Sequence, residues 1–149
     1  MVPFAGYEMP VQYQSGVLKE HLHCRKSVGL FDVSHMGQVA LRAESYEAAA
    51  KAFEALVPQD VMGLGAGRQR YGFFTNDVGG IEDDLMFANR GDHLFVVVNA
   101  ACKEADIARM VAALSPDVAV EEITDRALVA LQGPAAETAL ARLNPAVAG

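Results

Sequence analysis

The residues from Tyr71 to Leu85 constrain the fold of this 149-residue chain more than any other stretch. An apolar run over residues 71–75 leads into Asn76-Asp77-Val78-Gly79-Gly80, and a second run starts at Ile81. Asn, Asp and Gly suit tight turns between strands, because they tolerate left-handed backbone or bond their own backbone. The stretch therefore predicts two strands joined by a short turn.

Two adjacent carboxylates, Asp83 and Asp84, lie in the second of these strands. Side chains alternate between the faces of a strand, so the two acids are expected on opposite sides of the sheet. If Ile81 and Leu85 share a face, Asp83 lies on it. Asp84 then faces the other way, together with Glu82 and Met86. One of the two acids is thus expected on a buried face of the sheet, where carboxylates are rare, and this makes it a candidate functional residue.

Composition is that of a globular domain with a sizeable core. The chain is 52% hydrophobic and 21% charged, which argues against wholesale disorder. The net charge of −7 argues against non-specific binding to nucleic acid or to an anionic membrane. No apolar run approaches the roughly 20 residues of a membrane span, and there is no basic-then-apolar signal segment.

The two cysteines, Cys24 and Cys102, lie far apart and match no CxxC or zinc spacing. We interpret them as reduced thiols in a reducing compartment. The expected location is the cytoplasm of a bacterium, or the mitochondrial matrix of a eukaryote, where a transit peptide already removed would leave no trace.

Periodicity and turn residues predict an α+β fold. Helices are expected at 16–26, 45–56 (capped by Ser45), 100–114 and after Pro134. Strands are expected at 38–42, 70–75, 81–88, 93–99, 118–123 and 127–132, and residues 1–13 indicate an irregular packed segment. Hairpin-linked strands mixed with crossover helices favour a mixed or antiparallel sheet with helices packed on one face.

Local patterns add three expectations. Glycines at 63, 65 and 67 follow a helix and precede a strand, the reverse of a dinucleotide fingerprint, and so indicate a connecting loop. Residues 107, 110, 111 and 114 predict the buried side of the helix at 100–114. The Ala/Val-rich end over residues 144–149 has no closing element, which suggests a cut rather than a terminus.

Five blocks, in order, carry a resemblance to a known family. They are Phe4-Ala5-Gly6-Tyr7-Glu8-Met9-Pro10-Val11-Gln12-Tyr13, Gly29-Leu30-Phe31-Asp32-Val33-Ser34-His35-Met36-Gly37, Gly79-Gly80-Ile81-Glu82-Asp83-Asp84-Leu85, Val97-Val98-Asn99-Ala100-Ala101 and Ala130-Leu131-Gln132-Gly133-Pro134. The Asp-Val-Ser-His-Met-Gly block is specific, whereas Gly-Gly-Ile-x-Asp-Asp is shared more widely among folate-dependent relatives. The chain resembles the N-terminal portion of the glycine cleavage system T-protein, the aminomethyltransferase family.

The resemblance implies a chemistry, a co-substrate and a partner. A T-protein passes the methylene carbon of the aminomethyl group on the lipoyl arm of H-protein to tetrahydrofolate, and ammonia is released. The family has three domains in a cloverleaf around a central folate pocket. Residues 1–149 are therefore expected to be the N-terminal folate-binding region of an aminomethyltransferase, with tetrahydrofolate as co-substrate and lipoylated H-protein as partner.

The resemblance also assigns site residues. Asp84 matches the family's catalytic carboxylate, expected to bond the reactive pterin nitrogens and to assist proton movement. Met36, Tyr71 and Asn99 match positions that line the folate pocket, where a thioether and a flat ring suit the pterin face and an amide suits its edge. Asn99 alternatively caps the helix that follows it.

The remaining candidates have mainly structural readings. Asp83 is expected to bond backbone near the turn, Asp32 to hold a bend, and His35 to have a hydrogen-bonded structural role. His21 and His23 fall on nearly opposite sides of a helix, and no spacing suggests a metal site.

The chain also departs from the family, whose members are usually more than twice as long. The later arginine and glutamate folate contacts have no counterpart here, so the fragment is expected to be inactive alone and to leave an open apolar face. The rival functions are a folate-dependent transferase or demethylase for another donor (sarcosine, dimethylglycine or a methylated sulfur compound) and a non-catalytic folate-binding iron–sulfur assembly protein.

Overall fold

The computed structural model describes residues 1–148, which fall into two compact units. One unit comprises Met36–Arg126, and the other combines Met1–His35 with the chain from Ala127 onward. In both units the strands pair antiparallel. The predicted α+β class, with helices packed on an antiparallel sheet, is confirmed.

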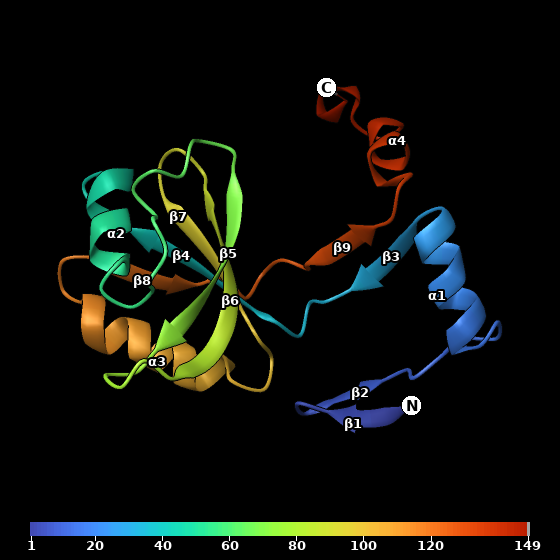
Figure 1. The fold of residues 1–149 in the computed structure, drawn as a ribbon, viewed down its shortest axis with the longest axis horizontal. Coiled ribbons are helices and arrows are strands. Elements are labelled where there is room, and N and C mark those ends of the chain that lie inside the picture. Colours follow the sequence, from blue (N-terminus) through green and yellow to red (C-terminus); the bar gives the residue numbers. More distant parts are fainter. Residues whose placement is uncertain (149) are drawn as a thin grey trace. The chain divides into compact units, whose positions relative to one another are not determined.

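A five-stranded sheet in the order β5-β6-β7-β4-β8 organises the unit Met36–Arg126. Its strands are β4 (Gly37–Arg42), β5 (Gln69–Thr75), β6 (Ile81–Asn89), β7 (Leu94–Val98) and β8 (Ala119–Glu122). Helices α2 (Tyr46–Phe53) and α3 (Lys103–Leu114) cover the same face of this sheet (Figure 1). These elements lie within a few residues of the predicted ones, and residues 63–67 form the expected connecting loop.

The hydrophobic core lies between the two helices and the sheet face that they cover. Alternate residues of each strand point into it, such as Leu85 and Phe87 on β6. Phe53 of α2 meets Phe74 and Phe87 edge to face, with ring centroids 6.2 and 5.9 Å apart. Each such side chain contributes about 1.5–3 kcal/mol when fully buried, so this cluster holds α2 to the sheet.

The sequence predicted features of α2 more accurately than the buried side of α3. Ser45 is the N-cap of α2 as expected, since its Oγ accepts from the backbone N–H of Ala48 at 3.2 Å. The prediction for α3 was wrong in one position, because Val111 is 44% exposed. The buried stripe is Asp106, Met110 and Leu114, which recur every four residues along the face toward the sheet.

A bulge alters the alternation at the start of β6. Phe74 pairs with Asp83 but Thr75 pairs with Ile81, so Glu82 is an extra residue. Glu82 forms an ion pair with Arg109 of α3, whose guanidinium lies 5.6 Å from the centre of the Phe74 ring. The expectation that Glu82 shares the face of Asp84 was therefore wrong, because the bulge turns Glu82 toward α3.

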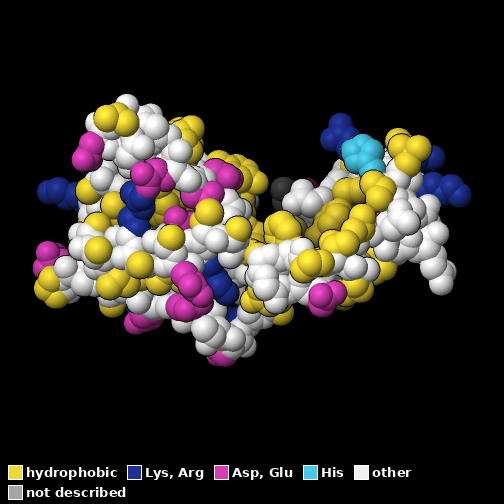
Figure 2. Space-filling model, turned by 90° about the horizontal axis from the view of Figure 1, so that it is seen from below, with side chains coloured by type: hydrophobic (Ala, Val, Ile, Leu, Met, Phe, Trp, Pro, Cys, Tyr) yellow, Lys and Arg dark blue, Asp and Glu magenta, His cyan; other side chains and the backbone are white. Residues whose placement is uncertain are grey.

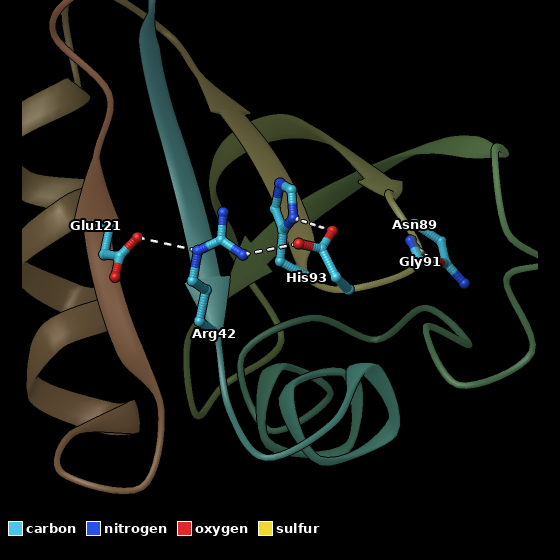
Figure 3. A network of polar contacts seen from close by, with 6 residues as sticks. Arg42, Asn89, Gly91, His93 and Glu121 are labelled. Carbon is cyan, nitrogen blue, oxygen red and sulfur yellow. Dashed lines mark hydrogen bonds and ion pairs between the residues drawn. The ribbon is translucent and has the colours of Figure 1, made fainter.

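Polar contacts join the loop between β6 and β7 to the sheet at the opposite end of these strands (Figure 3). Arg42 bonds Glu121 through Nε and Asp92 through Nη1, both at 3.1 Å. Asp92 also contacts Nδ1 of His93 at 2.7 Å. The hydrogen bonds with His93 and Arg42 lower the pKa of Asp92. This network orders a loop and lies away from the candidate site residues.

The other unit is built from hairpin pairs and short helices. Its elements are β1 (Val2–Phe4), β2 (Tyr7–Met9), α1 (Val17–Lys26), β3 (Gly29–Asp32), β9 (Val129–Gln132), α4 (Ala136–Ala141) and the 3₁₀ turn η1 (Pro145–Val147). The interpretation of residues 1–13 as irregular was wrong, because β1 and β2 pair there around a turn at Ala5 and Gly6, both with positive φ.

None of the described residues of this unit is buried. Its large hydrophobic side chains are exposed instead, among them Phe4, Leu18, Leu22 and Leu30, and in Figure 2 yellow side chains gather on it. The open apolar face that was expected from the sequence is thus present on this unit. None of the helices that the structure describes has the length and hydropathy of a membrane span.

Candidate functional site

The strand register brings three of the four predicted site residues into one row. Leu85 and Gly37 both lie opposite Val98, on β6, β4 and β7 respectively. Continuing each ladder by one residue puts Asp84 and Met36 on either side of Asn99. Asp84 and Asn99 belong to the sheet face that the helices leave uncovered, because residues 85 and 98 point to the core. Met36 lies in the bend just before β4.

Tyr71 lies on the same face, in the adjacent row. It is opposite Met86, while Phe73 is opposite Asp84. Tyr71 is therefore a diagonal neighbour of Asp84, at a spacing that long and aromatic side chains bridge. The Tyr71 side chain is 71% exposed, so its ring is free to contact a ligand above the sheet.

Asn99 is hydrogen-bonded to both acids of β6. Its Nδ2 donates to Oδ1 of Asp83 at 3.1 Å, to the backbone carbonyl of Asp84 at 2.9 Å and to Oδ1 of Asp84 at 3.1 Å. Backbone carbonyls and carboxylates only accept. The amide orientation is thereby defined, since the flipped amide would direct Oδ1 of Asn99 at three acceptor oxygens.

The alternative role of Asn99 as a helix cap was wrong. The N-cap of α3 is Cys102, which makes no side-chain capping bond. Asn99 contributes only its backbone carbonyl, which accepts from Cys102 N–H at 3.2 Å. Its side-chain oxygen Oδ1 remains directed away from the acids, as an acceptor for another group.

The two acids of β6 differ in burial, as alternation predicted. Asp84 is exposed on the uncovered face, whereas Asp83 is half-buried toward α3. The expected partner of Asp83 was wrong: its Oδ1 accepts from Asn99 rather than from the turn. The turn is closed by Asn76, whose Oδ1 accepts from Val78 and Gly80 N–H at 3.2 and 2.8 Å.

Asp106 is a polar residue of this region that sequence reasoning missed. It is 5% exposed on α3, and burial, followed by the hydrogen bond and charge of Asp83, raises its pKa to about 7. Burial and the charges of Asp83 and Asp106 also raise the pKa of the Cys102 thiol. The signal was available, because Asp106 lies four residues before Met110 and eight before Leu114.

The other sequence candidates lie in the unit of Met1–His35. Asp32 holds its bend as expected, with Oδ1 accepting from Ser34 N–H at 3.0 Å. Hydrogen bonding by the Ser34 side chain, followed by this backbone bond, lowers the pKa of Asp32. The His35 ring packs against Phe4 and Tyr7, with centroids 5.8 and 5.9 Å apart. Residues 1–148 contain no group of three side chains suited to hold a metal ion.

Comparisons with known proteins agree with these features. A family model described as the GCVT N-terminal domain matches residues 1–148. The mitochondrial aminomethyltransferase of Dictyostelium discoideum is 47% identical over 94% of this chain and 36% of that protein. The aminomethyltransferase of Rubrobacter xylanophilus is 45% identical over 100% of this chain and 39% of that protein.

A solved structure is similar as well. The glycine cleavage system aminomethyltransferase T from Bartonella henselae superposes with a TM-score of 0.85 at 37% identity, over 95% of this chain and 38% of that one. The chain thus spans less than two fifths of the length of each of these relatives.

Proposed function

Because the chain belongs to the family of the GCVT N-terminal domain, we propose that it supplies the folate-binding part of an aminomethyltransferase of the glycine cleavage system. The reaction transfers a methylene carbon from the aminomethyl group on the lipoyl arm of H-protein to tetrahydrofolate. The carbon–nitrogen bond to the amino group and the carbon–sulfur bond to the lipoyl arm both break, while the carbon forms bonds to N5 and N10 of tetrahydrofolate. The protons lost from these two nitrogens leave with the ammonia and on the dihydrolipoyl thiol, and 5,10-methylenetetrahydrofolate remains. We further propose that residues 1–149 act as the N-terminal folate-binding region.

One observation carries this proposal: Asp84 and Asn99 are hydrogen-bonded on the uncovered sheet face, Met36 follows in the same row, and Tyr71 is diagonal to Asp84. The row offers a carboxylate, an amide oxygen and apolar surface side by side. A pterin has the matching features, since it presents N–H donors along its edge and a flat π-face. Met36 and Tyr71 are the residues proposed to contact that face.

Asp84 is the proposed catalytic residue. Its Oδ1 accepts from Asn99, which fixes the carboxylate on the open face of β6. From there it bonds the reactive pterin nitrogens, orients N5 toward the incoming methylene and accepts a proton as the new bond forms. Asn99 holds this carboxylate with Nδ2 and contributes Oδ1 to the ligand.

The relatives support a proposal for the donor, the partner and the location. The named relatives are aminomethyltransferases, one of them mitochondrial, so the rival donors and the iron–sulfur assembly role are less well supported. We infer that lipoylated H-protein is the partner. The proposed location is the bacterial cytoplasm or, in a eukaryote, the mitochondrial matrix.

The proposal is tested with Asp84→Asn in a full-length aminomethyltransferase that carries this sequence as its N-terminal part. The amide has the shape of the carboxylate but cannot take up the proton, so turnover should fall by about 10²–10⁴-fold while the circular dichroism spectrum is unchanged.

Asp77→Asn is the matched control, because Asp77 is an exposed carboxylate in the turn of the same hairpin. It should leave turnover near that of the wild type. Normal turnover of Asp84→Asn would remove Asp84 from the mechanism, whereas equal losses in both variants would point to the hairpin as a whole.

A further inference from the structure

Asp106 places a carboxyl group on the buried stripe of α3. It shares this stripe with Met110 and Leu114, whose side chains belong to the hydrophobic core. An ionised carboxylate in such surroundings is strongly disfavoured unless donors compensate it. The structure must therefore supply a compensating donor, or the group must keep its proton.

Two buried carboxyl oxygens lack a hydrogen-bond donor in the part of the chain that the structure describes. Oδ2 of Asp83 and Oδ2 of Asp106 are both enclosed, and neither meets a donor among residues 1–148 when both carboxyls are ionised. Two carboxylates only accept hydrogen bonds and repel each other. Glu82, the neighbour of Asp83, pairs with Arg109, one turn after Asp106, so α3 is docked with the two carboxyls near each other. A hydrogen bond between the two carboxyls requires a proton on one of them.

Among residues 1–148, the charged groups around Asp106 do not supply a donor that would compensate an ionised Asp106 carboxylate. Asp83 faces it from β6, and Cys102 lies one turn before it on α3. Arg109, the cation of the next turn, is engaged by Glu82. The Lys103 stem lies beside Gly37, where an added Cβ would come within 2.8 Å of its Cγ.

We propose that Asp83 and Asp106 share one proton, and that Asp106 is thereby a positioning residue for the folate site. Protonated Asp106 donates to the Asp83 carboxylate. Asp83 then accepts from Nδ2 of Asn99, which also holds Asp84. This relay of hydrogen bonds, from Asp106 in the core through Asp83 to Asn99 on the sheet face, keeps Oδ1 of Asn99 turned toward the ligand. This role rests on the proposed function, whereas the shared proton does not.

The shared proton is tested on the present chain by carbon-13 NMR of labelled aspartate carboxyls. The Asp106 signal should titrate near pH 7, as its pKa of about 7 requires, and Asp83→Asn should move this midpoint downward, because the charge of Asp83 is removed and an amide donor replaces it. Titration of Asp106 near its ordinary value of 3.8 would overturn the proposal even if the enzyme activity is as proposed.

The positioning role is tested with two substitutions in the full-length aminomethyltransferase. Asp106→Asn keeps a donor toward Asp83 and preserves the single negative charge of the pair, so KM for tetrahydrofolate should stay near that of the wild type. Asp106→Ala removes the donor and should raise this KM about tenfold, with a smaller change in kcat. Equal KM for the two variants would refute the relay, and the NMR result would still decide the shared proton separately.

Discussion

Replacing Asp106 by asparagine should change how the stability of this chain depends on pH. The folded-state pKa of Asp106 is about 7 against an ordinary value of 3.8. Between these values the folded chain holds a proton that the unfolded chain has lost. The stability that Asp106 contributes is therefore complete below pH 3.8 and is lost as the pH rises toward 7. An asparagine side chain does not titrate, so the variant lacks this dependence.

The size of the effect follows from the shift. One pKa unit corresponds to about 1.4 kcal/mol, and the raised value exceeds the ordinary one by about 3 units (7 minus 3.8). The wild type should therefore lose about 4 kcal/mol relative to Asp106→Asn over this range, with a slope of about 1.4 kcal/mol per pH unit. Above pH 7 the difference should be constant. Acids far from Asp106, such as Asp92, titrate alike in both proteins and cancel in the comparison.

The measurement is urea unfolding followed by circular dichroism, at pH values from about 4 to 8. Asp77→Asn, which alters an exposed turn residue, is the control and should run parallel to the wild type. A difference curve without slope would refute the reasoning, because Asp106 would then ionise equally in both states. A wild type that gains stability relative to Asp106→Asn as the pH rises would mean that the N-terminus of α3 stabilises the ionised carboxylate.

Two further substitutions, together with one control substitution, test the packing and the capping arguments. Phe53→Ala should lower the free energy of unfolding by about 3–5 kcal/mol, because Phe53 is 0% exposed between Phe74 and Phe87. The control Phe4→Ala, at a side chain that is 52% exposed, should change the free energy of urea unfolding by less than about 0.5 kcal/mol. Equal effects would show that the core does not lie where the burial indicates. Ser45→Ala should lower the free energy of unfolding by about 1 kcal/mol, and an unchanged midpoint would mean that the bond to Ala48 adds nothing.

Local sequence patterns were sufficient to predict the features that depend on a single element. The Asn76–Gly80 turn, the Ser45 cap and the apolar run of β7 all depend on neighbours within a few residues, so local composition and turn chemistry predicted them. Residues 1–13 failed this test because β1 and β2 are only three residues long and mostly exposed. Such short strands carry too little alternation to be recognised.

The candidate site depended on long-range register. Met36, Asp84 and Asn99 come from strands far apart in sequence, and only the pairing of β4, β7 and β6 brings them into one row. The family resemblance selected these residues, but it did not include Asp106. The role of a carboxyl on a helix cannot be predicted before the helix is packed on the sheet and Asp83 lies next to that carboxyl.

The sequence by itself determined that one strand carries two acids facing opposite ways, because alternation is a property of any extended chain. Only the tertiary structure decided what each acid does. The bulge at Glu82 and the docking of α3 direct Asp83 toward Asp106, whereas the sheet register sets Asp84 beside Asn99. Burial and long-range pairing arise from distant parts of the chain, so no local pattern contains them.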